Sequence, residues 1–318
     1  MSASLAFVFP GQGSQSLGML AELGAEYPLI LETFKEASEA LGYDLWALTQ
    51  QGPEELLNQT DKTQPAILTA SIALWRLWLA EGGARPAFVA GHSLGEYSAL
   101  VAAGSLTLAD AVKLVERRGQ LMQEAVPAGQ GGMAAILGLE DADVLAACAE
   151  AAQGEVVSAV NFNSPGQVVI AGAKAAVERA IEGCKARGAK RAMPLPVSVP
   201  SHCALLDAPA RELASAFAKV ELRAPQVRYL SSSSARLIRD PQTLRDDLAY
   251  NMSRVVDWQA TLVTAYERGV RLHLELPPGS VLSGLARRVF APGQAIAFAG
   301  ARLDTLDAML RQEVSRDR

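Results

Sequence analysis

The sequence predicts an α/β protein with a parallel-sheet core and one inserted subdomain. Short apolar runs typical of buried strands alternate with helix-forming segments over the first part of the chain. A glycine-rich stretch at 127–132 interrupts this alternation, and the segment behind it has the order β-α-β-β-α-β. Near residue 200 the first pattern resumes. We therefore expect residues 1–127 and 199–318 to form one domain, into which residues 128–198 are inserted.

The first part of the chain supplies the start of the parallel sheet. Expected strands lie at 5–9 and 87–90, and expected helices lie at 29–41, 65–80, 95–103 and 107–125. The apolar helix 65–80, with Thr63 near its N-terminal cap, is interrupted by Arg76 and is too short to span a bilayer. The N-terminal apolar run has no positive segment before it and breaks at Pro10, so neither a membrane segment nor a signal peptide is expected.

The inserted segment has its own regular order. Its expected elements are MAAILGL, a helix at 142–152, EVVSAVNF, QVVIAG, a helix at 173–186, and KRAMPLPVSV. This is the ferredoxin-like order. Behind it we expect helices near 205–219, 241–252 and 258–268, strands at RYLSSSS and LHLEL, and a final helical stretch.

Composition excludes several classes of function. Half of the 318 residues are hydrophobic, 20% are charged, and the net charge is −5, which argues against a general nucleic-acid-binding protein. The three cysteines, Cys148, Cys184 and Cys203, have no metal-binding or disulfide spacing and suit a reducing compartment. We therefore expect a cytoplasmic protein with no metal site and no membrane contact.

The stretch AFVAGHSLGEYSAL, residues 87–100, contains the pattern G-x-S-x-G. Gly91 and Gly95 flank Ser93 where an apolar strand meets a helix-forming run, which is the setting that a nucleophile elbow needs. The alternative is a tight turn with an incidental serine. Because a serine hydroxyl is a weak nucleophile at its ordinary pKa, a catalytic Ser93 needs a base within hydrogen-bonding reach.

The sequence offers three histidines as that base. His92 adjoins Ser93 but should project away from it, and His273 lies in the apolar strand LHLEL, where a buried structural histidine is expected. His202 follows a strand and a proline in VSVPSH, where a loop can direct its imidazole toward another residue. A structural role is open to it as well, but His202 is the best candidate base for Ser93.

Five motifs together resemble the malonyl-CoA:acyl carrier protein transacylases. They are FPGQGSQ at 9–15, GHSLGE at 91–96, Arg118-Gly119 with Met122-Gln123, NFNSPGQ at 161–167, and PSH at 200–202. The match runs over nearly the whole chain in the family's order. It implies an α/β-hydrolase-like domain with a ferredoxin-like insertion, in agreement with the order of elements above.

The resemblance also implies roles for single residues. Ser93 would carry the acyl group, His202 would be its base and later acid, and the backbone N–H groups of Gln12 and Leu94 would form the oxyanion hole. Asn251 would support the histidine. Gln64 and Asn163 would lie near the site. The glycines around Gln12 equally fit an ordinary turn at a strand end.

Arg118 is the residue that bears on the substrate. Taken alone, the adjacent Arg117 and Arg118 favour an exposed pair. Its position in the family instead implies that Arg118 binds the distal malonyl carboxylate through two charge-assisted hydrogen bonds. An acetyl group lacks that carboxylate and would leave a buried guanidinium unpaired, so discrimination against acetyl is expected.

Two departures from the family pattern affect finer points. Asn251 and Val255 stand where the family commonly has glutamine and proline, which puts the details of histidine support in question. The segment ELPPG at 275–279 lacks the glycine common before Pro278, and with RYLSSSSARL and ARLDTLDAML it resembles the transacylase subunit of malonate decarboxylase. Fatty acid synthesis and malonate decarboxylation both remain open as pathways.

The expected activity is malonyl transfer from malonyl-CoA to the thiol of an acidic acyl carrier protein, without a cofactor, by a monomer or by a subunit of a larger complex. Basic residues that could meet the carrier, or simply form solvated faces, are Lys185, Arg187, Lys190 and Arg191 on the insertion, and Arg287 with Arg288 beyond it. The alternatives are a serine esterase that transfers the acyl group to water and a catalytically silent carrier-binding subunit.

Overall fold

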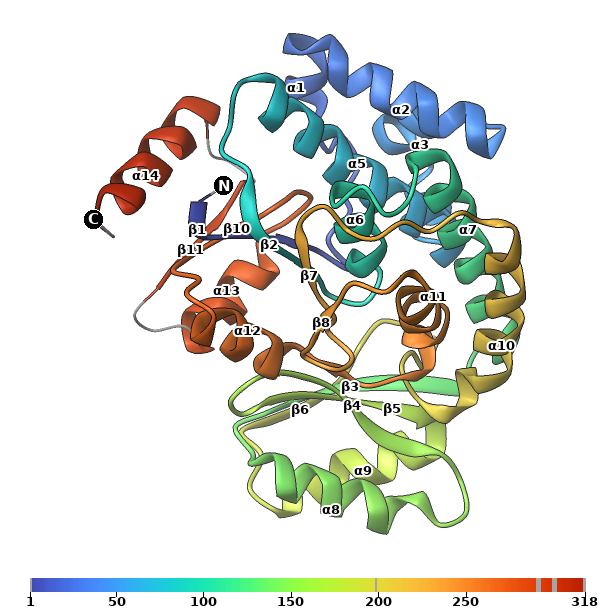
Figure 1. The fold of residues 1–318 in the computed structure, drawn as a ribbon. Coiled ribbons are helices and arrows are strands. Elements are labelled where there is room, and N and C mark those ends of the chain that lie inside the picture. The colour runs from blue at the N-terminus through green and yellow to red at the C-terminus, as the bar shows by residue number, and fades with distance from the viewer. Residues whose placement is uncertain (1, 198, 290–292, 299–301, 317–318) are drawn as a thin grey trace.

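The computed structural model describes residues 2–197, 199–289, 293–298 and 302–316, which form two sheets with helices packed against them (Figure 1). The elements before the inserted segment are β1 (Ser2–Phe9), α1 (Ala21–Glu26), α2 (Pro28–Leu41), α3 (Leu45–Gln51), α4 (Glu54–Leu57), α5 (Thr60–Ala80), β2 (Pro86–Gly91), α6 (Gly95–Ala102) and α7 (Leu108–Ala125). The inserted segment holds β3 (Gly131–Leu137), α8 (Asp141–Ala152), β4 (Val157–Ser164), β5 (Gln167–Ala173), α9 (Lys174–Ala186) and β6 (Arg191–Pro194). The elements behind it are η1 (Ala204–Leu206), α10 (Asp207–Ala216), η2 (Phe217–Lys219), β7 (Arg228–Leu230), β8 (Leu237–Ile238), α11 (Pro241–Tyr250), η3 (Asn251–Ser253), β9 (Val256–Asp257), α12 (Trp258–Glu267), β10 (Leu272–Glu275), α13 (Val281–Val289), β11 (Gln294–Ala297) and α14 (Leu303–Arg316).

The first sheet has the strand order β11-β10-β1-β2-β7-β8, and only β8 runs antiparallel to its neighbour. Successive residues of β1 point to opposite faces, so both faces are apolar. Phe7 and Phe9 pack into the core that holds α2, α5 and α7, whereas Ala6 and Val8 pack with α12 and α13. The predicted parallel-sheet core is confirmed.

The second sheet has the order β6-β3-β5-β4-β9. Its first four strands pair antiparallel in the ferredoxin-like arrangement, and α8 and α9 cover one face with a separate apolar core (Figure 1). The fold class expected from the sequence is therefore confirmed, while the boundaries 128 and 198 of the insertion stay predictions.

Strand β9 joins the two halves of the molecule in a way that the sequence did not indicate. It comes from the segment behind the insertion, yet it pairs parallel with β4, with Asn161 opposite Val256 and Phe162 opposite Asp257. The turn of η3 immediately precedes it. This strand therefore fixes the position of η3 relative to the second sheet.

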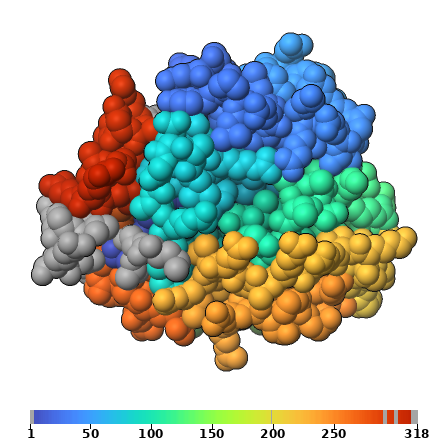
Figure 2. Space-filling model, turned by 45° about the horizontal axis from the view of Figure 1, so that its top comes forward, coloured from blue at the N-terminus to red at the C-terminus, as the bar shows by residue number. Residues whose placement is uncertain are grey.

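Several element boundaries differ from the expected ones. Helix α5 begins at Thr60, with Gln59 rather than Thr63 at its cap, because Thr60, Thr63 and Gln64 are buried and extend the helix by one turn. Strand β7 ends at Leu230, since the serines behind it form a turn. The short, half-buried strand β11 was not predicted. Figures 1 and 2 place α14 at one side of the molecule, away from α7 and α10. No helix in the described part of the chain is long and apolar enough to cross a membrane.

Candidate active site

Ser93 lies at the tight turn between β2 and α6. Its φ is 55°, a left-handed conformation that is uncommon for residues other than glycine. The flanking glycines are required by close packing: a Cβ on Gly91 would lie 1.9 Å from the carbonyl carbon of Gly95, and one on Gly95 would lie 2.1 Å from the Phe9 carbonyl oxygen. The G-x-S-x-G pattern thus reflects a backbone that leaves no room for a Cβ at the two glycines around a half-buried serine.

The loop after β1 lies beside this turn. Phe9 is paired with Gly91 in the sheet, and the His92 N–H donates to the Phe9 carbonyl at 3.0 Å. A Cβ on Gly11 would lie 2.8 Å from the His92 carbonyl oxygen. The backbone at Gln12 and Leu94 therefore belongs to two adjoining turns, with Leu94 at the N-cap of α6. This placement is compatible with the oxyanion hole expected from the sequence.

His202 lies within hydrogen-bonding distance of Ser93. Its Nε2 is 2.7 Å from the serine Oγ. Its Nδ1 lies 2.8 Å from the Asn251 carbonyl and 3.0 Å from the Arg254 carbonyl. Because carbonyl oxygens only accept, Nδ1 carries the proton and Nε2 is free to accept one from Ser93. The backbone of His202 also has a positive φ, 68°, and its N–H donates to Met252 at 2.7 Å.

The imidazole of His202 is held neutral. Burial, followed by the nearby positive charge of Arg118, lowers its pKa to about 3. At neutral pH, Nε2 therefore carries no proton and is ready to accept the one from the serine.

Arg118 is buried at the same point, with 1% of its surface exposed. Nη2 is 3.3 Å from Ser93 Oγ, Nη1 donates to Gln64 Oε1 at 2.9 Å, and Nε and Nη2 donate to Asn251 Oδ1 at 3.2 and 3.1 Å. All four bonds go to neutral oxygens. Burial lowers the pKa of Arg118, but an arginine keeps its charge. The neighbouring Arg117 instead forms an ion pair with Glu212 at the surface.

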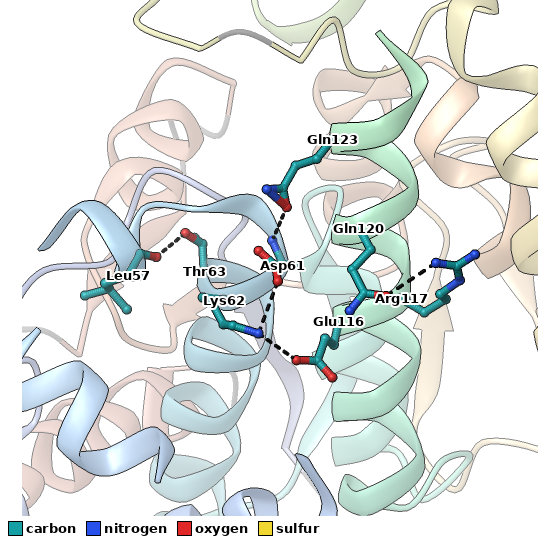
Figure 3. A network of polar contacts seen from close by, with 8 residues as sticks. All are labelled: Leu57, Asp61, Lys62, Thr63, Glu116, Arg117, Gln120 and Gln123. Carbon is teal, nitrogen blue, oxygen red and sulfur yellow. Dashed lines mark hydrogen bonds and ion pairs between the residues drawn. The ribbon is translucent and has the colours of Figure 1, made fainter. Parts of the chain in front are cut away.

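A polar network connects the start of α5 with α7 (Figure 3). Lys62 Nζ lies 3.1 Å from the Asp61 carboxylate and 2.9 Å from that of Glu116. Gly119 allows the two backbones to touch, because a Cβ there would lie 2.5 Å from the Asp61 Cα. The start of α5 is thereby held against the stretch of α7 that carries Arg118.

Asn251 connects the three groups. Its backbone carbonyl accepts from His202, its side-chain oxygen accepts from Arg118, and its amide nitrogen donates to the Ser93 carbonyl at 3.0 Å. The sequence predicted histidine support here, and the contact is made by the main chain. The side chain holds the arginine, a role that the sequence did not suggest.

The remaining predicted residues lie around this group. Asn163 Oδ1 is 2.8 Å from His92 Nε2, so the ring of His92 bonds to the second sheet rather than to Ser93. Gln12 contributes a side-chain contact of 3.2 Å to Thr60 Oγ1. His273 is buried in β10, and burial lowers its pKa to about 4.

Glu96 is a buried residue of the site that the sequence reasoning did not assign. Burial, reinforced by the negative charge of Asp247, raises its pKa to about 8. It lies three residues after Ser93 within the matched motif, which was the available signal. Its partners, Ser232 and Asn251, are more than 130 residues away in the sequence, so the contact was not visible there.

Two of the candidate docking cations are engaged within the insertion. Lys185 pairs with Glu182 at 2.8 Å, and Arg187 pairs with Glu150 at 2.5 Å. Arg288 donates to Gln167 at 3.0 Å and so connects α13 with β5. All three side chains therefore have a partner within this chain.

Comparison with known proteins places this geometry in a family. The chain matches the model of the acyl transferase domain over residues 6–312. The chain belongs to this acyl transferase family. The resemblance drawn from the five motifs is thereby confirmed at family level.

Related acyl transferases match over most of their length. The chain is 60% identical over 284 residues to the malonyl CoA-acyl carrier protein transacylase of Salmonella typhimurium, covering 89% of this chain and 92% of that protein. A crystal structure of an acyl carrier protein S-malonyltransferase from Vibrio cholerae has a TM-score of 0.93 and 55% identity, covering 96% of this chain and 99% of that one. A malonyl-transacylase solved in complex with a type II PKS acyl-carrier protein has a TM-score of 0.94 and 51% identity, with coverage of 96% and 99%.

Proposed function

We propose that this acyl transferase moves a malonyl group from malonyl-CoA to the thiol of an acyl carrier protein, through a malonyl ester on Ser93. The observation on which this rests is that one hydroxyl has a neutral imidazole 2.7 Å away on one side and a buried guanidinium 3.3 Å away on the other. The names of two relatives given above, a malonyl CoA-acyl carrier protein transacylase and an acyl carrier protein S-malonyltransferase, support the same substrate pair.

The first half-reaction forms the ester. Nε2 of His202 takes the proton of Ser93 Oγ as the oxygen attacks the thioester carbonyl. The negative charge on the carbonyl oxygen is stabilised by the backbone N–H groups of Gln12 and Leu94. The C–S bond then breaks, and the leaving CoA sulfur takes the proton from His202.

The second half-reaction runs the same steps in reverse with a new thiol. The carrier thiol gives its proton to His202, its sulfur attacks the ester carbonyl, and Ser93 Oγ leaves and regains the proton. All bonds and protons are accounted for by two side chains and two thiols, so the proposed reaction requires no metal or redox cofactor.

Arg118 provides the substrate preference. A guanidinium has five N–H donors, of which four have the oxygen partners given above. A malonyl carboxylate can take the Nη2 N–H that now reaches Ser93 together with the remaining Nη1 N–H, in a two-pronged contact. It would supply the anion for a buried cation that now has neutral partners. An acetyl group cannot.

The carrier and the pathway are part of the proposal. An acyl carrier protein as the acceptor is supported by the relative of the same fold that was solved with a bound carrier. That this carrier is acidic stays a prediction from the sequence. Between the two pathways, the names of the relatives favour the general carrier of fatty acid synthesis over a malonate decarboxylase carrier. A cytoplasmic location stays a prediction, in keeping with three free cysteines, all buried.

A loading assay separates this proposal from its rivals. The protein is incubated with malonyl-CoA and either a carrier with a phosphopantetheine arm or one with the longer arm derived from dephospho-CoA. We expect malonyl transfer to the first carrier to exceed both transfer to the second and release of free malonate. Dominant release of malonate would favour the esterase, and absence of any turnover would favour the silent carrier-binding subunit.

A further inference from the structure

Glu96 occupies a fully buried position in the first turn of α6, directly behind the Ser93 turn. Its Oε1 accepts from the backbone N–H of Ser232 at 2.6 Å and from the Ser232 hydroxyl at 2.8 Å. Its Oε2 accepts from the Asn251 amide at 2.9 Å. Three donors thus converge on one carboxylate that the proposed reaction does not use.

Both the oxygen and the nitrogen of the Asn251 side-chain amide form hydrogen bonds. Nδ2 donates to Glu96 Oε2 and to the Ser93 carbonyl, while Oδ1 accepts two N–H groups of Arg118. The two ends of an amide have nearly the same shape, so their orientation is determined by the donors and acceptors around them. Arg118 only donates, so the amide end that faces it is Oδ1, and Nδ2 is the end that donates to Glu96 Oε2.

We propose that Glu96 is a positioning residue for malonyl specificity: it fixes the orientation of the Asn251 amide and, through it, the direction of the Arg118 guanidinium. The inference rests on the proposed function. It extends that function by a residue that touches neither the substrate nor the reacting atoms.

Replacing Glu96 by glutamine exchanges one oxygen acceptor for an NH2 donor and leaves the shape of the side chain nearly unchanged. If the new Oε1 keeps the two Ser232 bonds, the new Nε2 faces Asn251 Nδ2, and two donors meet. Turning the Asn251 amide relieves this contact but directs Nδ2 at Arg118, where donors meet again. Either way Arg118 loses its present alignment, because buried donors without acceptors are unfavourable.

The dyad should be affected much less. His202 is held by the backbone carbonyls of Asn251 and Arg254, which do not depend on the amide orientation. Acetyl transfer uses the dyad but not the guanidinium contact with a distal carboxylate. The structure therefore predicts that loss of Glu96 changes the preference between two acyl groups rather than acylation in general.

The test compares acylation of Ser93 by malonyl-CoA and by acetyl-CoA in full-length wild type and Glu96→Gln, followed by mass spectrometry over time. We expect the malonyl-to-acetyl rate ratio to fall about tenfold or more in the variant. Glu275→Gln is the matched control: Glu275 is also a buried acidic side chain, but its three donors come from Leu282 and Ser283 in α13 and none comes from Asn251. Its ratio should stay at the wild-type value.

The possible results separate a failure of the Glu96 proposal from a failure of the proposed malonyl transfer. An unchanged ratio in Glu96→Gln, or an equal fall of the ratio in Glu275→Gln, overturns the positioning role. This holds even if both rates decline, because a folding defect lowers the rates with both substrates alike. If Glu96→Gln does not fold, Glu96→Asp, which retracts the acceptor by one methylene, must show a fall in the same ratio. Wild-type protein that accepts no malonyl group refutes the proposed function itself, and the role of Glu96 with it.

Discussion

The Nη2 atom of Arg118 lies 3.3 Å from the Oγ of Ser93, and the guanidinium is as fully buried as the apolar core around it. A permanent charge thus stands next to the nucleophile with oxygens of neutral groups as its partners. Such a cation is costly to bury and is stabilised when an anion reaches it. The arrangement couples the choice of acyl group to the position of one side chain.

Arg118→Met should change substrate preference. The replacement keeps an apolar side chain in the buried space but removes the partner of the malonyl carboxylate, so kcat/KM for malonyl-CoA should fall by about 100-fold, or roughly 3 kcal/mol. Acetyl-CoA, which lacks the carboxylate, should be affected less. Steady-state loading with both donors measures the two changes.

Arg117→Met is the control for that experiment. Arg117 is the next residue on α7, but its side chain lies at the surface in an ion pair with Glu212. Exposed pairs contribute little, so both activities should stay within about twofold of wild type. Equal losses for malonyl and acetyl in Arg118→Met would mean that Arg118 supports the fold and not the substrate.

Stability should decrease in acid because of His202. Its pKa is about 3 in the folded protein and near 6.5 in the unfolded chain. Between these two pH values His202 is protonated in the unfolded chain but not in the folded protein. The free energy of unfolding therefore falls as the pH falls from 6.5 toward 3. Above pH 6.5 this histidine contributes no pH dependence.

Urea unfolding of wild type and His202→Gln at pH 7.5 and pH 5 checks this sign. Other groups titrate in both proteins, including Glu96, whose raised pKa of about 8 acts in the opposite direction. The difference between the two proteins isolates His202. Wild type should lose about 2 kcal/mol more than the variant between the two pH values. Parallel losses would contradict the lowered pKa.

Gly95→Ala should damage the turn that holds Ser93. The new Cβ would lie 2.1 Å from the Phe9 carbonyl oxygen, so β1 and the turn must separate, at about 3 kcal/mol of stability. Acylation should fall with it, because Ser93 moves away from His202. Thermal unfolding and Ser93 loading measure both effects.

Gly284→Ala provides the comparison. This glycine lies within α13, with no atom within 4 Å of a new Cβ, so alanine should raise stability by about 0.5 kcal/mol and leave activity unchanged. If Gly95→Ala were as harmless as Gly284→Ala, the close packing described for the Ser93 turn would be wrong.

Sequence patterns were sufficient to predict those features that depend on residues close to one another in the chain. The Ser93 turn needs small residues at fixed spacing, and the ferredoxin-like order follows from alternating strand and helix patterns. His202 could be selected because the chain has only three histidines. Arg118 required the family resemblance, since nothing in its helix separates it from Arg117.

Contacts between segments far apart in the chain could not be predicted from such local patterns. The bond of Glu96 to Ser232 spans 136 positions, and the pairing of the two-residue strand β9 with β4 depends on how the two sheets pack. A two-residue strand has no periodicity to detect. The dual use of Asn251, with its main chain on His202 and its side chain on Arg118, likewise exists only once the chain has folded.

Intact-protein mass spectrometry after incubation with malonyl-CoA tests the central claim most directly. Wild type should gain the mass of one malonyl group, peptide mapping should place it on Ser93, and Ser93→Ala should gain none. A wild-type protein that stays unmodified while carrier loading proceeds, or a malonyl group on another residue that persists in Ser93→Ala, would contradict the account.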